Sequence, residues 1–571
     1  MASLATEVRE ARHGGLADVL GKQPVLDAEA LFRHSLGAGR RERAAEWAVQ
    51  AAERAAEMLA FARAAELYGR ALEFKEWDEA RMASLKIARA EALVSAGRGA
   101  EAAPVFLSAA AHAASGEQLD LRRRAAEQYL ITGHMDEGSA VIRGVLGDIG
   151  LRYPRTFRAL AVGLGARLIA LWLRGGWIPN RAAADTAAEA AARMEACHSA
   201  AKGLVFVDPI RGLYFAVLSL WLALRWGDRE RVALAFASAG IALLPIGGAL
   251  GRLAARLINS ARETATTTTN HYLRDLTVVS MAEVRMMEGR WQEMLALCDA
   301  GRDALREHCR GVTWEVDGTY SGSCRALEEI GEIRAMGRRA DELLGQAEQR
   351  GDLYGIVTAL LYQALCRLLK GDTVGVRSLA RRILACWTPS GFNTQHFYLF
   401  RLETYCDICE GRPSEAWRRI QDTWPKLQRS NLLRHALVRN DSQLLRARTA
   451  LAVACRDSGD RSVMSACAER DAARFARESR PDMSAHALLI GAGAAALRGD
   501  RQTAISQLRE AARRFEAAGM QLFRALTRRR TGELIGGEIG RQLIAQAGEH
   551  FQREGITDAQ ALLATYAPGF D

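Results

Sequence analysis

A spaced pattern of small and apolar residues recurs ten times along this 571-residue chain. In each copy a glycine is followed at +5, +9 and usually +12 by a small or apolar side chain. The copies begin at Gly97, Gly371, Gly499, Gly39, Gly133, Gly227, Gly289, Gly331, Gly411 and Gly459. The +5, +9 and +12 positions share one face of an α-helix, and glycine suits the turn before it. Each copy therefore predicts a turn followed by the second helix of a helix pair.

The residues that define this repeat are expected at turns and at the contact between paired helices. They are Gly97, Ala102, Phe106, Ala64, Tyr68, Gly371, Ala380, Gly411, Ala416, Gly499 and Ala504. The copy from Phe61 to Ala71 is degenerate, because Leu59 stands where the glycine should be. Helix pairs that repeat in this way are typical of solenoid proteins, which usually hold partners.

The pattern predicts an all-α solenoid of about eleven helix pairs in two sub-arrays. Residues 1–27 are a lead-in, and Asp27 is expected to cap a helix that begins near Ala28. We expect the first sub-array over 28–150, an irregular seam rich in glycine and proline over 151–210, the second sub-array over 211–530, and a capping helix with a tail over 531–571. Within the seam, helices are predicted for Arg158–Arg174 and Ala182–Lys202.

The formal net charge of +10 changes this interpretation little. Arginine supplies most of the positive charge and is spread along the chain on stretches that also carry carboxylates, as solvated helix faces do. No basic stripe interleaved with aromatic residues is present, which argues against nucleic-acid binding.

The cysteines and apolar segments indicate the compartment. Ten scattered cysteines fit a reducing cytoplasm. The close pair Cys406 and Cys409 lacks the second pair of ligands that a zinc site needs.

Two apolar segments, Val232–Gly251 and Gly212–Leu224, carry no charge. Glycines and a proline interrupt the first segment, and the second is too short to span a bilayer. We interpret both as buried helices, with a membrane hairpin over 212–251 as the alternative.

The sequence contains no complete catalytic motif. The string Gly15–Gln23 has five residues between its glycines instead of four, and Gln23 stands where a P-loop needs Ser or Thr. The protein-kinase and hydrolase motifs are missing, and Ser321–Cys324 is predicted as a structural turn. We therefore expect a protein that is not an enzyme and that binds neither cofactor nor metal.

Several strings resemble a known family. The spacing Gly-x-x-x-x-Ala-x-x-x-Phe/Tyr-x-x-Ala resembles tetratricopeptide repeats. Leu36–Ala45, Arg123–Gln128, Gly133–Gly138, Gly555–Asp558 and Ala567–Phe570 are similar to the C-terminal repeat region of large bacterial signalling proteins. Those proteins carry a serine/threonine kinase domain and an AAA-type NTPase module before the repeats. The resemblance implies a right-handed superhelix, and Met1 is expected to fall where the NTPase module ends.

These observations lead to three functional hypotheses. The first is a non-catalytic scaffold or sensor in bacterial signal transduction, whose concave face binds a peptide, a partner domain or a small effector. In that hypothesis apolar pockets and arginines recognise acidic groups or a C-terminal carboxylate. The second is a regulatory remnant that acts in trans on a separately encoded kinase or NTPase. The third is a membrane-associated helical protein.

Overall fold

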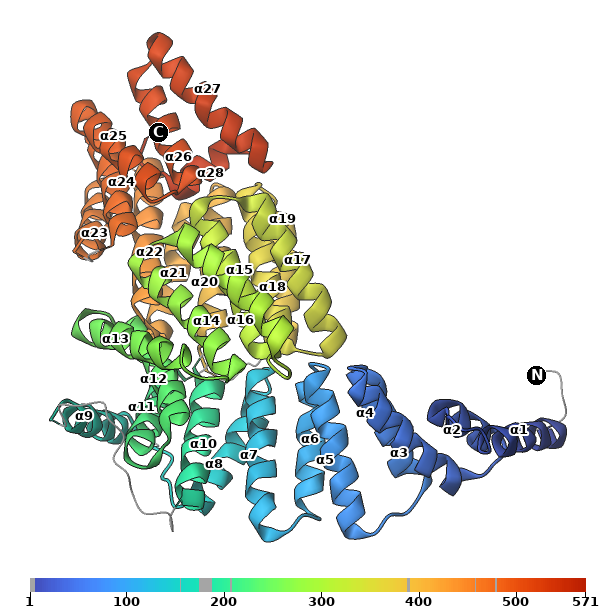
Figure 1. The fold of residues 1–571 in the computed structure, drawn as a ribbon. Helices are drawn as coiled ribbons and strands as arrows, with labels where there is room; N and C mark the ends of the chain where they lie inside the picture. The colour runs from blue at the N-terminus through green and yellow to red at the C-terminus, as the bar shows by residue number, and fades with distance from the viewer. Residues whose placement is uncertain are drawn as a thin grey trace. The chain divides into compact units, whose positions relative to one another are not determined.

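The computed structural model describes residues 6–154, 156–173, 187–205, 208–387, 391–457, 459–477 and 480–570. This part of the chain contains twenty-eight α-helices and no strand, so the predicted all-α helical-repeat fold is confirmed (Figure 1). The helices exceed the expected eleven pairs, because several of them lack the glycine pattern. Two compact units divide the chain. Unit 1 extends to Tyr153 and includes Arg310–Thr313 and Gln349–Asp352, and unit 2 contains the remainder from Pro154.

Unit 1 is a series of helices in which each packs against the next. Its helices are α1 (Thr6–Leu20), α2 (Ala28–Gly37), α3 (Arg41–Glu57), α4 (Phe61–Phe74), α5 (Glu79–Ser95), α6 (Gly99–Ala110), α7 (Ser115–Ile131) and α8 (Met135–Asp148). The cap on α2 is confirmed, because the Asp27 carboxylate accepts a hydrogen bond from the Ala30 amide at 2.9 Å. Alanine fills much of the core, and small side chains let helices approach closely.

Unit 2 begins with α9 (Phe157–Leu173) and α10 (Ala187–Leu204), close to the two helices predicted in the seam. Residues 174–186 of the predicted seam, which include Gly175, Gly176 and Pro179, lie outside the described residues. The next elements are α11 (Pro209–Trp226), α12 (Arg229–Leu243), the 3₁₀ helix η2 (Leu244–Ile246) and α13 (Gly248–Ala265). None of the described helices combines the length and apolar character needed to cross a membrane.

The second half of unit 2 continues the helix pairs to the end of the chain. Its elements are α14 (His271–Glu288), α15 (Trp291–His308), α16 (Thr313–Ile330), α17 (Ile333–Arg350), α18 (Leu353–Leu369), α19 (Thr373–Cys386), α20 (Thr394–Cys409), α21 (Pro413–Arg429), η3 (Leu432–Arg434), α22 (Ala436–Arg456), α23 (Arg461–Phe475), α24 (Pro481–Leu497), α25 (Arg501–Ala517), α26 (Gln521–Ile535), α27 (Gly537–Glu554) and α28 (Ala559–Tyr566). The expected tail thus contains a further helix, α28, which packs on α20 and α22. Ser321–Cys324 lies inside α16, so its prediction as a turn was wrong.

Alternate helices of unit 2 form an inner layer. Contacts join α12 to α14, α18 to α20, α20 to α22 and α22 to α24. A hydrogen bond from Tyr362 of α18 to the carbonyl of Ser321 on α16 continues the layer. We call α14, α16, α18, α20, α22 and α24 the inner helices. They are buried on most faces, whereas intervening helices such as α19 and α21 bury a single stripe.

Most of the repeat glycines adopt the left-handed conformation that ends a helix. Eight of the ten have a positive φ, and Gly227 and Gly459 do not. Apart from the half-buried Met464, the residues at +5 and +9 are buried, as Ala102, Phe106, Ala380, Ala416 and Ala504 show. In the degenerate copy Ala64 and Tyr68 are likewise buried.

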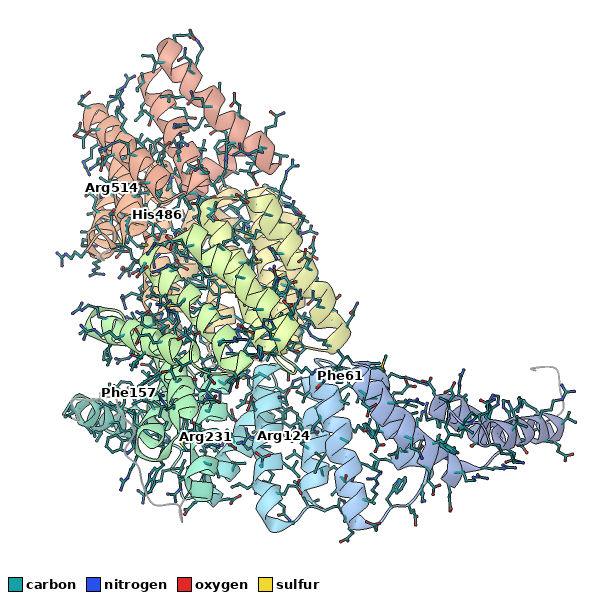
Figure 2. All side chains as sticks on the ribbon, viewed as in Figure 1. Phe61, Arg124, Phe157, Arg231, His486 and Arg514 are labelled. Carbon is teal, nitrogen blue, oxygen red and sulfur yellow. The ribbon has the colours of Figure 1, made fainter. Side chains whose placement is uncertain are left out.

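Leu59 occupies the same left-handed position, with a φ of 63° and an exposed side chain. Phe61, labelled in Figure 2, begins α4 two residues later. A side chain in this conformation costs about 1–2 kcal/mol that glycine avoids. We expect Leu59→Gly to raise the free energy of unfolding of unit 1 by about 1 kcal/mol. Hydrogen exchange of α3 and α4 in urea measures the change.

Met58→Gly is the matched control, because Met58 is also exposed but has an ordinary φ of −81°. Glycine there should lower stability by about 0.5–1 kcal/mol. Equal effects of the two substitutions would contradict the strain assigned to Leu59.

Candidate functional site

A cavity of about 310 Å³ lies on the inner side of unit 2. Its walls come from α10, α11, α12, η2, η3 and the inner helices α14, α16, α18, α20 and α22. None of the outer helices α15, α17, α19 and α21 contributes a lining residue. This volume falls at the lower end of the range of about 300–1,000 Å³ that is typical of small-molecule sites. We call it the inner cavity.

A stripe on α14 supplies one wall of the inner cavity. Tyr272, Leu276, Val279, Glu283 and Met286 follow one another at spacings of three or four residues, so they share a helix face. Glu283 is the only charged side chain in this stripe, and no hydrogen bond or ion pair to a described residue engages its carboxyl group. Burial raises the pKa of Glu283 to about 7. A carboxyl group in this setting titrates in the neutral range.

The raised pKa of Glu283 has a measurable consequence for stability. The folded protein binds the proton more tightly than the unfolded chain does, so stability decreases as pH rises from about 4.5 to about 7. We expect Glu283→Gln to remove up to about 3 kcal/mol of this decrease in unit 2. Urea unfolding of the wild-type protein and of Glu283→Gln between pH 4.5 and pH 8, monitored by hydrogen exchange of α14, tests this prediction.

Part of the decrease of stability with rising pH should remain in Glu283→Gln, because burial also raises the pKa of Glu329 to about 7. A pH dependence identical in the two proteins would contradict the burial of a Glu283 carboxylate.

Buried ion pairs join three inner helices at one side of the inner cavity. The guanidinium group of Arg325 on α16 contacts Glu328 at 3.1 Å, Glu329 at 2.7 Å and Asp441 on α22 at 3.1 Å. Arg401 on α20 contacts the same Glu328 at 2.9 Å and Asp441 at 3.6 Å. We call these five residues the interior ion network.

Asp441 and the two arginines of the interior ion network are held in their charged forms, whereas burial raises the pKa of Glu329 to about 7. Burial would raise the pKa of Asp441, but Arg325 and Arg401 outweigh burial and lower it below its usual value. The pKa values of both arginines are raised, since the neighbouring carboxylates outweigh their burial. These inner-face arginines therefore already hold carboxylates of the chain itself.

A second group of buried polar residues lies where α22, α24 and α28 meet. Arg448 donates to the Tyr405 hydroxyl at 3.0 Å, and its guanidinium group lies over the rings of Phe523 and Tyr566. His486 on α24, labelled in Figure 2, has its Nδ1 3.4 Å from Arg448. Burial and the neighbouring arginines hold the pKa of His486 well below its usual value, so this imidazole is neutral. The adjoining cavity of about 30 Å³ has room for about one water molecule.

The cysteine pair singled out in the sequence lies in packed surroundings. Burial raises the pKa of Cys406 to about 12 and that of Cys409 to about 11. The Cys409 Sγ lies 3.1 Å from the Thr565 hydroxyl of α28. Among the described residues no cluster of three or more His, Cys, Asp or Glu is suited to hold a metal ion.

None of the repeat-defining residues lines the inner cavity. Gly97, Gly371, Gly411 and Gly499 end helices, and the alanines and aromatic residues of the pattern lie between packed helices. The sequence analysis missed Glu283. Its signal was a single carboxylate in an otherwise apolar or aromatic stripe of α14.

Comparisons with known proteins leave the family open. No family model matches the chain, and no curated protein matches its sequence. Among solved structures, one similar chain is a Signal Transduction ATPase with Numerous Domains from Pyrococcus horikoshii with a tetratricopeptide repeat sensor. It has 11% identity and a TM-score of 0.28 over 67% of this chain and 54% of that protein. Another is a circular tandem repeat protein, with 14% identity and a TM-score of 0.12 over 96% of this chain and 98% of the other. Likenesses this distant leave the function to be argued from the chain's own residues.

Proposed function

We propose that this protein is a non-catalytic helical-repeat sensor whose unit 2 binds a small ligand in the inner cavity. The observation that carries the proposal is the cavity itself, which is walled by successive inner helices. A ligand there touches several repeats at once, so its binding energy stabilises their packing. The ligand-bound array is then recognised by a partner protein in cytoplasmic bacterial signalling, as the resemblance to kinase-associated repeat regions suggests.

Peptide binding through free arginines on the inner face is less well supported. Arg325 and Arg401 face the inner cavity but hold buried carboxylates of the interior ion network. An acidic peptide would have to displace these contacts, and leaving buried charges unpaired costs about 3–5 kcal/mol. A compact ligand that leaves the network intact avoids that cost.

The inner cavity offers a direct test of ligand binding. A Cβ at Gly318 of α16 would meet no other heavy atom within 4 Å, and Gly318 lines the cavity. Gly318→Leu should therefore place a bulky side chain in the cavity and reduce the space for a ligand. We expect metabolite fractions from the source cells to raise the melting temperature of the wild-type protein and not that of the variant.

Equal shifts in the wild-type protein and Gly318→Leu would place binding elsewhere and overturn the proposal. Gly345→Leu on α17 is the matched control. A Cβ there also meets no atom within 4 Å, but Gly345 does not line the cavity.

A second candidate function follows from the strings that resemble kinase-associated repeat regions, such as Arg123–Gln128 and Gly133–Gly138. In it the chain regulates a separately encoded kinase or NTPase subunit in trans. Capture of the tagged protein from its source cells at low and moderate salt tests it. A stoichiometric kinase or NTPase subunit that survives moderate salt supports the candidate, and its absence from the captured proteins overturns it.

A further inference from the structure

The charged groups that line the inner cavity are paired, with one exception in its interior. Lys202 contacts the Glu315 carboxylate at 2.7 Å, and Arg325 and Arg401 hold the carboxylates of the interior ion network. Glu283 has no partner among the described residues. The unbalanced charge inside the cavity is therefore negative.

The rim of the inner cavity does not supply the missing cation. Arg434 is exposed, and its guanidinium group lies 4.6 Å from the centre of the Phe157 ring, which is labelled in Figure 2. His435, also at the cavity, is neutral because burial lowers its pKa to about 4. In the empty cavity a proton neutralises Glu283 at and below its pKa of about 7, and a bound cation would take the place of that proton.

We propose that the inner cavity binds a small organic cation, whose amine or quaternary ammonium group pairs with Glu283 and whose apolar body fills the remaining space. The proposal rests on the proposed function, because it names the ligand class of the same cavity. It is carried by charge complementarity and by the composition of the walls.

The walls suit a cation with an apolar body. Most lining residues are aliphatic or aromatic, and Trp314, Tyr354, Tyr362 and Tyr398 present rings. Aromatic faces attract ammonium groups, most strongly where water is excluded.

The chain itself shows how an ammonium group is held in this cavity. The Lys202 Nζ lies 5.3 Å from the centre of the Trp314 ring and 2.7 Å from Glu315. An aromatic face and a carboxylate together accommodate this cation in a half-buried position. Glu283 offers the second carboxylate of the cavity, without a lysine to fill it.

Binding of a permanent cation should release the Glu283 proton. The elements packed on α14 bring few titrating groups to it: Cys298 from α15, and no charged lining residue from α12, α13 or η2. From α16, Glu315 is paired with Lys202, and Arg325 keeps its charge. Burial raises the pKa of Cys298 far above neutrality. The affinity for a permanent cation should therefore increase about tenfold for each unit by which the pH rises toward 7, and it should be constant above pH 7.

Isothermal titration calorimetry with four matched probes tests the proposal. The probes are phenylbutylamine, phenylbutyltrimethylammonium, phenylbutanol and phenylbutanoate, which share one apolar body and differ in charge. We expect both cations to bind the wild-type protein at least about tenfold more tightly than the alcohol or the acid. Glu283→Gln should remove this preference and the pH dependence, because it removes the one titrating carboxyl group to which both are assigned.

Glu288→Gln is the matched control on α14, because Glu288 is exposed and pairs with Arg285. It should leave both cation affinities unchanged. Cation binding that survives Glu283→Gln, or that falls equally in Glu288→Gln, overturns the role of Glu283.

The remaining outcomes separate the two proposals. If the alcohol or the acid binds best and Gly318→Leu abolishes that binding, the cation proposal fails while ligand binding in the cavity stands. If neither these probes nor the metabolite fractions distinguish the wild-type protein from Gly318→Leu, both proposals fail.

Discussion

Replacing Arg325 by methionine is expected to lower the free energy of unfolding of unit 2 by about 3–5 kcal/mol. The substitution keeps the length of the side chain but leaves Glu329 and Asp441 buried without the cation that holds them. Hydrogen exchange in urea should show the loss across α16, α20 and α22, the helices that the interior ion network joins. Exchange of α5 in unit 1 should stay the same and serves as an internal reference.

The loss should shrink at low pH, which distinguishes it from lost packing. Glu329 has a pKa of about 7, so at pH 5 it is already protonated and needs the arginine less. A loss of equal size at pH 5 and pH 8 would assign the effect to packing instead of charge.

Arg541→Met is the matched control for the loss of an arginine. Arg541 pairs with Glu538 within α27, and both side chains are about 70% exposed (71% and 67%). Exposed pairs contribute little, so this change should cost at most about 0.5 kcal/mol. Arg325→Lys keeps the positive charge but loses the planar guanidinium group with its several donors. Its loss in free energy of unfolding should lie between those of Arg325→Met and Arg541→Met.

Gly331→Ala is expected to cost about 3 kcal/mol or more in unit 2, well above the cost at other repeat glycines. Gly331 has a φ of 93° at the turn from α16 to α17. A Cβ there would lie 2.4 Å from the Leu522 Cβ and 2.7 Å from its backbone nitrogen, so α26 must shift to admit it. Urea unfolding followed by hydrogen exchange of α17 and α26 measures the loss.

Gly499→Ala isolates the conformational part of this cost. Gly499 has a similar φ of 78°, but a Cβ there would meet no heavy atom within 4 Å. We expect a loss of about 1–2 kcal/mol from the left-handed backbone alone. Equal losses at the two glycines would show that Leu522 moves freely and would contradict the close packing of α26 on this turn.

The local rules of helices account for what could be predicted from the sequence. The glycine-led pattern located the turns because only glycine adopts a left-handed backbone at little cost, and the +5 and +9 residues of the pattern were expected to be buried because they share a helix face. Even the degenerate copy followed the rule, since Leu59 takes the conformation of the missing glycine. The number of helices was underestimated where, as at α13 and α28, the turn has a left-handed glycine (Gly247 and Gly555) but the spaced pattern does not follow it.

Tertiary structure alone decided the candidate site. The inner cavity joins residues as distant as His198 and Val438, and Arg325 meets Asp441 across 116 positions of sequence. No spacing rule along the chain connects such residues, because their meeting depends on how successive helix pairs stack.

Glu283 shows the difference between the two levels. In the sequence it is one carboxylate among many on helices, and only the apolar and aromatic residues that share its helix face mark it. The stacking of the inner helices leaves it half-buried in a mostly apolar cavity, without a cation among the described residues. The sequence by itself determined the helices and their turns, because these depend on neighbours within one or two helical turns. Only the tertiary structure decided which charges inside unit 2 are paired and which one lacks a partner among the described residues, because pairing and desolvation depend on residues far away in the chain.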